Sequence, residues 1–280
     1  MKKSLTLIIA VYNAVRYLEY IFAALQRQSM MDFEVIVADD GSGPDIKSLV
    51  DRSRRHVSFP ILHLWQPDEG FKKNAMLNKA ITASETEYLV FIDGDCVPHH
   101  HFIKDHWIHR KENSLLCGRR VNFSKQVADK LTVDDFRTGR FETMSLNILF
   151  DGFMARSSNL EDAIRIESPV LRRILHRNKA RILGCNFSTH KRLLEQVNGF
   201  NEEYQAPGLG EDSDIAFRVE LVGARLATLR YLAVLYHLYH PVTVVGEVNK
   251  RIFERVIAAR EAVCRRGLKY LDEVQVGLKQ

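Results

Sequence analysis

Apolar residues in the first hundred positions form short runs, separated by segments with helical spacing. The runs are continuous, as is typical of strands buried on both faces, and cover residues 5–11, 33–38, 61–64 and 88–92. The segments between them place apolar residues on one helical face, at residues 15–28, 45–56 and 71–83. This alternation predicts an α/β fold, with a mostly parallel, Rossmann-like sheet flanked by helices.

The pattern after residue 100 is less regular. Strand-like runs cover residues 115–123, 181–189 and 227–237. Helices are expected over 190–198, from Glu211 onward, and over 249–270 as a C-terminal helical extension. Residues 124–183 are polar and rich in basic residues, and their pattern predicts helix only in places.

Two carboxylates follow the apolar run at 88–92, in the segment FIDGDCVP. Asp93 and Asp95 flank Gly94, and carboxylates this close repel each other unless something positive lies between them. Residues two apart in an extended chain point to one face, so we expect both side chains to face one site. Hard divalent cations such as Mg²⁺ and Mn²⁺ take carboxylate oxygens, which makes a metal site one interpretation. A surface turn is the other, because Asp and Gly are turn residues.

Two more acidic clusters lie where predicted elements meet. Asp39 and Asp40 end the second strand, where a carboxylate either accepts hydrogen bonds from a base or ribose, or caps the next helix. The segment GEDSD begins a helix with Glu211, Asp212 and Asp214. Negative side chains stabilise the start of a helix for structural reasons alone, but a carboxylate is also the kind of group that acts as a general base.

Histidines end the last predicted strand, in the segment YHLYHP. His237 and His240 lie where that strand stops, although a single histidine is more often an ordinary core residue. Ligands of parallel sheets bind at the carboxyl ends of the strands, and the acidic clusters also lie there. We therefore expect the four clusters to gather at one edge of the sheet.

Composition narrows the class of protein. The 280 residues carry a formal net charge of +5, too mild to indicate nucleic-acid binding. The four cysteines form no CxxC pair, which favours buried, reduced thiols in a cytoplasmic protein over a zinc site or disulfides. No apolar stretch approaches the roughly 20 residues needed to span a bilayer. The apolar run near Met1 is too short for a signal peptide.

Taken in order, these motifs resemble those of the family 2 glycosyltransferases, which have the GT-A fold. LIIAVYNAVRYLEYIFAALQRQ…DFEVIVADDGS resembles their N-terminal signature, and FIDGDCVP resembles their metal-binding Asp-x-Asp. GCNFSTHKRLLEQVNGFNEEY…GLGEDSDIAFRVELVGARL resembles their acceptor loop and Glu-Asp base region. That last segment is also similar to galactosyltransferase and chondroitin-polymerase type domains. The resemblance covers about residues 4–241 and implies the fold and the type of reaction, but not the sugar.

The resemblance implies a nucleotide site formed by Ala10, Val11, Tyr12, Asp39, Asp40, Lys72, Asp93 and Gly94. Asp40 would bind the uracil N–H with support from Asp39, and Lys72 lies where relatives often have a basic residue. Many relatives carry an Arg-Asn pair in the following helix. This chain has Leu77 before Asn78, so no arginine role is carried over, and Lys72 and Lys73 would supply the positive charge.

The resemblance also implies a metal site and a catalytic base. Asp95 would be the direct ligand of Mn²⁺ or Mg²⁺, and Asp93 would face ribose or metal. His237 would be a further metal ligand, and His240 is the alternative residue for that role. Asp212 would be the base that takes the acceptor proton in an inverting displacement, and Glu211 is the second choice.

We therefore predict an inverting, metal-dependent hexosyltransferase. It would move a sugar from a UDP-sugar to a hydroxyl of a glycan or glycolipid in cell-surface polysaccharide synthesis. Residues 1–245 would form the GT-A domain, with a nucleotide-binding half at 1–100 and an acceptor-binding half at 101–245. Two other functions stay open. One is a nucleotidyltransferase, although AVYNAVRY has none of the glycines of a phosphate loop, and the other is a nucleotide-sugar sensor without turnover.

Two segments concentrate basic residues. Residues 156–181 hold seven Lys or Arg against three acids, and residues 250–269 hold seven against two. The second segment belongs to a predicted amphipathic basic helix at 246–280. Such helices either pack on the domain with their charges in water or lie on an anionic membrane, here at the inner face. We expect no nucleic-acid partner.

Overall fold

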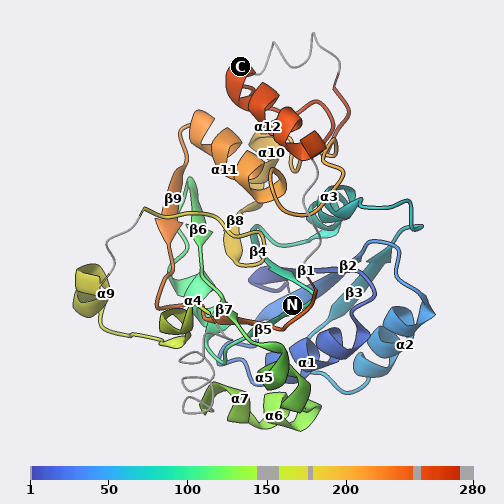
Figure 1. The fold of residues 1–280 in the computed structure, drawn as a ribbon, viewed down its shortest axis with the longest axis vertical. Helices are drawn as coiled ribbons and strands as arrows, with labels where there is room; N and C mark the ends of the chain where they lie inside the picture. The colour runs from blue at the N-terminus through green and yellow to red at the C-terminus, as the bar shows by residue number, and fades with distance from the viewer. Residues whose placement is uncertain (1, 144–157, 176–178, 242–246, 272–280) are drawn as a thin grey trace.

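The computed structural model describes residues 2–143, 158–175, 179–241 and 247–271. A seven-stranded sheet forms its centre, in the order β3-β2-β1-β4-β8-β6-β9 (Figure 1). Its parallel half consists of β1 (Leu5–Val11), β2 (Phe33–Asp39), β3 (Ile61–Trp65) and β4 (Tyr88–Asp93). β8 (Phe187–His190) is antiparallel to its neighbours, and β6 (Ser114–Cys117) and β9 (Arg225–Thr228) pair in parallel. The predicted α/β class is confirmed.

Two apolar cores lie on the two faces of this sheet. Leu7 and Ile9 of β1 belong to one core, with α1 (Val15–Leu25) and α2 (Pro44–Ser53). Ile8, between them, belongs to the other core, with α3 (Lys73–Ala83). Successive side chains of a strand point to opposite faces, so a strand covered on both faces is apolar at nearly every position. This explains the continuous apolar runs of the sequence.

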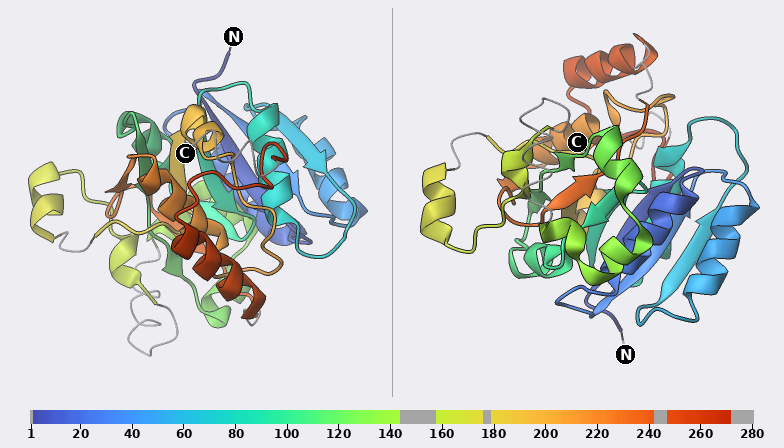
Figure 2. Two further views of the ribbon diagram at one scale, coloured as in Figure 1. Left: turned by 90° about the horizontal axis from the view of Figure 1, so that it is seen from above. Right: turned by 60° about the horizontal axis from the view of Figure 1, so that its bottom comes forward.

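The remaining helices are mostly short. They are α4 (Phe102–Ile108), α5 (Lys125–Lys130), α6 (Val133–Thr138), α7 (Arg140–Thr143), η1 (Leu160–Ala163), α9 (Pro169–Leu175), α10 (Lys191–Gln196), α11 (Glu211–Leu221) and α12 (Glu247–Ala259). Among them α9 stands away from the body of the molecule in every view (Figures 1 and 2). Within the described segments, no helix is long and apolar enough to cross a membrane.

Two strands predicted as single elements are each divided between two sheets. The run at 115–123 forms β6 and then β7 (Val121–Asn122), and the run at 227–237 forms β9 and then β10 (Leu235–His237). β7 and β10 leave the large sheet together and join β5 (Cys96–Pro98) in a three-stranded sheet, in the order β5-β10-β7. An apolar run shows that a segment is buried, but not where it bends.

The C-terminal helix is shorter than predicted. α12 ends at Ala259, and Arg260 has a left-handed φ of 51°, which stops the helix. The chain then runs back along the domain, where the Leu268 N–H donates to the Asn198 carbonyl at 2.9 Å. The rest of the predicted extension, 272–280, lies outside the described residues. The predicted division into a nucleotide-binding half before residue 100 and an acceptor-binding half after it stays a prediction. β8, β6 and β9, which come after residue 100, belong to the same sheet as the strands of the first half.

The strand predicted at 181–189 is also shorter than expected: β8 begins only at Phe187. All four cysteines are buried, as predicted, and their thiols are free.

Candidate active site

A cavity of about 580 Å³ lies at the carboxyl ends of β1, β2 and β4. Among the residues predicted from the sequence, it is lined by Ala10, Val11, Tyr12, Asp40, Asp93, Gly94 and Asp95. Lys73, Asp68 and His240 line it as well. The parallel strands end together, so residues more than 80 positions apart in the chain meet at one edge of the sheet.

Asp39 and Asp40 have different surroundings. Asp39 is fully buried, accepts the Ser42 N–H at 2.9 Å through Oδ1, and contacts His63 Nε2 at 2.9 Å through Oδ2. It therefore fixes the loop after β2, as a supporting residue would.

Asp40 is the carboxylate of this pair that lines the cavity. It accepts hydrogen bonds from Gln66 Nε2 at 2.6 Å and from the Lys72 backbone N–H at 2.9 Å. Burial raises the pKa of Asp40, against the lowering effect of those two N–H groups. Each carboxylate oxygen keeps a second lone pair, so Asp40 can still accept a hydrogen bond from a ligand.

Tyr12 supplies an aromatic surface beside Asp40. Its side chain is 54% exposed, and its hydroxyl donates to Asp68 Oδ2 at 2.9 Å. The hydroxyl contact orients the ring while leaving it open to the cavity. An exposed, oriented ring is suited to stacking on a base.

Gly94 brings the end of β4 against β1. Its N–H donates to the Ala10 carbonyl at 2.7 Å, and a Cβ atom at this position would lie only 3.0 Å from that oxygen and 3.1 Å from Val11 Cγ2. Any larger residue would push the turn away from β1. Gly94 therefore permits the close packing that puts Asp93 and Asp95 at the cavity.

Lys73 lies between two acids that are far apart in sequence. Its Nζ is 2.7 Å from Asp93 Oδ1 and 3.0 Å from Glu211 Oε1. Burial acts to lower the pKa of Lys73, but the two carboxylates outweigh it and hold that pKa well above its ordinary value. Burial raises the pKa of Glu211, and its Oε2 has no hydrogen-bond partner among the described residues. The positive group expected beside Asp93 is thus Lys73.

Asp95 has a different set of partners, because it sits in the turn after β4 rather than on the strand. Its Oδ2 is 3.1 Å from His240 Nε2 and 3.5 Å from His237 Nε2, and these two nitrogens are 3.2 Å apart. The Cys96 thiol donates to Asp95 Oδ1 at 3.1 Å. Asp93 and Asp95 therefore both border the cavity, but one faces a lysine and the other two imidazoles.

The donor atoms around Asp95 fit a divalent cation. One oxygen of Asp95, the Cys96 sulfur and a His237 nitrogen lie within 4.8 Å of one another. Burial acts to raise the pKa of Asp95, but its hydrogen bonds with His237 and His240 outweigh it and lower that pKa. The bond to Asp95 in turn raises the pKa of His240 to about 8. A carboxylate with imidazoles is a set that Mn²⁺ accepts, whereas Mg²⁺ prefers oxygen alone.

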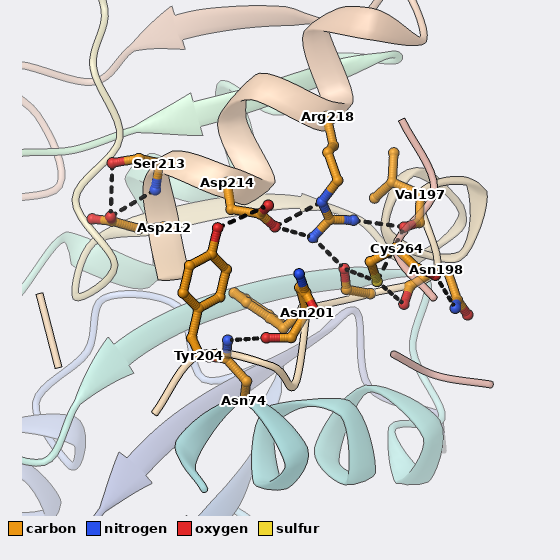
Figure 3. Close-up of polar contacts among 12 residues, drawn as sticks. Asn74, Val197, Asn198, Asn201, Tyr204, Asp212, Ser213, Asp214, Arg218 and Cys264 are labelled. Atoms are coloured by element: carbon orange, nitrogen blue, oxygen red, sulfur yellow. Dashed lines mark hydrogen bonds and ion pairs between the residues drawn. The ribbon is translucent and has the colours of Figure 1, made fainter. Parts of the chain in front are cut away.

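A buried ion pair fixes the start of α11. Arg218 Nε is 2.7 Å from Asp214 Oδ2, and the guanidinium also donates to the carbonyls of Val197 and Gly199 at 2.6 and 2.8 Å. The Tyr204 hydroxyl donates to the other oxygen of Asp214 at 3.2 Å (Figure 3). Asp214 is therefore a structural residue.

Asp212 points to the opposite side of the helix start from Asp214 (Figure 3). Its Oδ2 accepts the Gly184 N–H at 2.9 Å, and its Oδ1 accepts the Ser213 N–H at 2.7 Å. Neither Glu211 nor Asp212 lines the cavity itself: Glu211 is joined to it through Lys73, and Asp212 lies beside Gly184.

The structure separates Lys72 from the residues predicted with it. Lys72 lines a different cavity of about 710 Å³, next to α3 and the C-terminal segment, and contributes only its backbone N–H to Asp40. Lys73, one position later, carries the charge at the site. Lys73 was predicted with Lys72 as a source of positive charge, whereas Asp68, which holds Tyr12, was not predicted, since it lies in a loop without a distinctive motif. The assigned roles of these residues stay predictions.

The sequence matches two known family models, glycosyl transferase family 2 over residues 6–177 and the N-terminal domain of galactosyltransferase over residues 174–241. The chondroitin synthases of Escherichia coli and Pasteurella multocida are each 24% identical to this chain, over 239 and 229 residues. Those matches cover 83% and 77% of this chain, but only 34% and 23% of the two synthases. The chain therefore spans about a third or less of the length of these relatives.

Solved structures share the fold. Staphylococcus aureus TarS in complex with UDP superposes with a TM-score of 0.60 at 17% identity, covering 99% of this chain and 69% of that one. The mannosyltransferase PcManGT from Pyrobaculum calidifontis, in complex with GDP-Man and Mn²⁺, gives 0.54 at 19% identity, covering 85% and 57%. The first family model spans more than half of the chain, and the sheet order and these neighbours agree with it. This protein belongs to glycosyl transferase family 2 and has the GT-A fold.

Proposed function

We propose that this protein is an inverting, metal-dependent glycosyltransferase that moves a sugar from a nucleotide-sugar to a glycan or glycolipid hydroxyl. One observation carries the proposal: Asp40, Asp93 and Asp95 line a single cavity with the cationic Lys73 and with His240. A base-binding carboxylate, a positive group for phosphates and a set of metal ligands are the parts that transfer from a nucleotide-sugar requires. The chondroitin synthases among its relatives suggest a role in cell-surface polysaccharide synthesis.

A UDP-sugar is the donor we favour. Tyr12 would stack on the base and Asp40 would accept the uracil N3–H, with Asp39 holding the loop beneath. TarS binds UDP and UDP-GlcNAc in solved structures, which supports the same nucleotide here. The sugar itself would lie toward Asp93 and Lys73, beyond the nucleotide.

Mn²⁺ would be held by Asp95 with His237 or His240, and Asp93 would face ribose or metal. When bound, the ion would offset negative charge on the diphosphate leaving group. Lys73 adds a second positive charge on the same side of the cavity, 2.7 Å from Asp93. Exchange of its contact with Asp93 for a phosphate oxygen would keep Lys73 paired throughout binding.

Asp212 would be the general base. The acceptor hydroxyl oxygen forms a bond to the anomeric carbon while the bond from that carbon to the phosphate oxygen breaks. The hydroxyl proton passes to Asp212, and the electron pair leaves with the nucleoside diphosphate, so no covalent intermediate forms. The Gly184 and Ser213 N–H groups fix the orientation of the Asp212 carboxylate for this step.

A donor screen tests the proposal. We expect UDP-sugars with Mn²⁺ to raise the midpoint of thermal unfolding and to release UDP slowly by hydrolysis, while GDP- and dTDP-sugars do neither. Stabilisation by GDP- or dTDP-sugars alone would contradict the uracil assignment. Pyrophosphate release from a nucleoside triphosphate and a sugar phosphate would instead indicate a nucleotidyltransferase. Donor binding without any release of UDP, with or without acceptors, would indicate a sensor.

The Lys73→Met variant should lose stability, because Asp93 and Glu211 would then lie partly buried without their shared cation. Removing one partner of a buried ion pair typically costs about 3–5 kcal/mol, and the partial exposure of Asp93 places our expectation at the lower end. Urea unfolding would measure the change. Adding Glu211→Gln to Lys73→Met should restore part of the loss, whereas simple addition of the two single effects would contradict this pairing.

A further inference from the structure

The short helix α9 exposes an apolar face. None of its residues is buried, and four large apolar side chains lie in water: Val170 at 67% exposure, Leu171 at 44%, Ile174 at 60% and Leu175 at 44%. Figures 1 and 2 show the helix standing clear of the sheet and of the other helices. Contiguous exposed apolar residues on a protruding element mark an interaction surface rather than a core.

These side chains share one side of the helix. At 100° per residue, the four apolar positions fall within an arc of about 140°. Arg172 and Arg173 fall outside that arc. The helix is therefore amphipathic, with an apolar face turned outward and basic residues on the other side.

The support of α9 is firmly held to the domain. Arg165, four residues before the helix, makes two contacts of 2.8 Å with the fully buried Asp105, which also accepts the Ala233 N–H at 3.1 Å. A second pair, Arg230 with Asp162, holds η1 at 2.7 Å. Because the segment before α9 is held to the domain by these ion pairs, the helix beyond it exposes its apolar face to a partner.

The charged side chains on α9 and just after it are all positive. Arg172 and Arg173 lie on the helix, and Lys179 and Arg181 follow it, while the sequence has no acidic residue between 168 and 182. Arg172 donates to the carbonyls of Ile166 and Glu167 at 2.7 Å, so it also closes the first turn of the helix. The helix combines exposed apolar side chains with positive charge, a combination suited to an anionic lipid interface.

We propose that α9 docks this protein on an anionic lipid surface. Its apolar face would enter the boundary between head groups and acyl chains, with the basic residues at the level of the lipid phosphates. α12, the other basic helix, fits this role less well: Val256 is buried, Phe217 of α11 and Phe253 have their rings 6.5 Å apart, and Arg255 is paired with Glu203. This inference does not depend on the sugar-transfer proposal.

Co-sedimentation of the full chain with lipid vesicles tests the inference. We expect binding to vesicles of phosphatidylcholine with phosphatidylglycerol, weaker binding at higher salt, and none to phosphatidylcholine alone. The Leu171→Ser/Ile174→Ser variant should bind at least about tenfold more weakly. Its midpoint of thermal unfolding should not change, because these side chains are not part of the core.

A matched control uses α12. Val248 and Ile257 are 49% and 43% exposed, so Val248→Ser/Ile257→Ser removes a similar apolar area. We expect this control to bind vesicles like the unchanged chain. Loss of binding in the control, or full binding by the α9 variant, would overturn the assignment to α9.

A fluorescent reporter tests the same proposal when vesicle binding is too weak to measure by co-sedimentation. In Ile174→Trp, the emission should shift to shorter wavelength with anionic vesicles and stay unchanged with neutral ones. No shift with either kind of vesicle would overturn the proposal. So would the finding that the chain dimerises in the ultracentrifuge and that Leu171→Ser/Ile174→Ser makes it monomeric, because α9 would then be a contact between two copies.

Discussion

Asp212→Asn is expected to lower the turnover number by about 10²–10⁴-fold or more, while donor and metal binding stay near their original strength. The reason is chemical, since an amide has nearly the shape of the carboxylate but cannot take the acceptor proton. The Gly184 N–H can still donate to the amide oxygen. The Ser213 N–H would lose its acceptor, at a cost of about 1 kcal/mol in stability. Single-turnover transfer and titration with the donor would separate the two effects.

Glu211→Gln is the matched variant for this prediction. Glu211 is paired with Lys73, so its loss should weaken packing near the cavity without removing the base. We expect moderate loss of stability and measurable turnover. If Glu211→Gln is inactive while Asp212→Asn transfers sugar normally, the two roles are reversed.

Asp95→Ala is expected to abolish transfer and most of the Mn²⁺-dependent donor binding, while the fold survives. Asp95 is the carboxylate that faces both His237 and His240, and without it the two imidazoles lack an anionic co-ligand. Its side chain is partly exposed and lies in a turn, so its removal leaves the sheet intact. Calorimetric titration with Mn²⁺, with and without a UDP-sugar, would measure the loss. Full activity in EDTA would disprove the metal role.

Asp129→Ala is the control for Asp95→Ala. Asp129 is an exposed carboxylate on α5, paired with Lys125, and its removal should change neither metal binding nor transfer. His237→Ala and His240→Ala then decide which imidazole is the ligand. The variant with the larger loss of Mn²⁺ affinity identifies it.

The Asp-x-Asp motif shows how far sequence reasoning reaches at the site. An apolar run that ends on Asp93, Gly94 and Asp95 places these residues at a strand end, and the parallel sheet brings that end to Asp40. The motif could not show that Asp93 would face Lys73 while Asp95 faces histidines. A turn at Gly94 decides this, and its shape depends on contact with Ala10 in β1.

The two lysines at the start of α3 illustrate another limit. Lys72 and Lys73 are adjacent and chemically equal, and the family resemblance placed Lys72 near the nucleotide while leaving the positive charge to both. Successive residues point in directions about 100° apart around a helix axis. Lys72 precedes α3 and Lys73 is its first residue, so the point where α3 begins and its phase together decide which lysine reaches the cavity. Here Lys73 meets Asp93 and Glu211, while Lys72 lines the neighbouring cavity.

The acids of GEDSD show the same dependence on phase. Their composition marked the start of α11, but Asp214 is used to hold Arg218 in the core, and only Glu211 and Asp212 remain near the site. The predicted strand at 227–237 and the predicted helix at 249–270 failed for a related reason. Apolar content continues through a bend, and the places where β9 gives way to β10 and where α12 stops are set by backbone angles at residues such as Tyr231 and Arg260.

By itself, the sequence determined the α/β class, the buried strands of the first half, and the residue types gathered at their carboxyl ends. It could do so because strands covered on both faces must be apolar and because a parallel sheet puts its strand ends on one edge. Tertiary structure alone decided which acid faces which cation, how two apolar runs divide between two sheets, and that every apolar residue of α9 stays out of the core while α12 buries Val256. Each of these depends on contacts between segments distant in the chain, which no local pattern records.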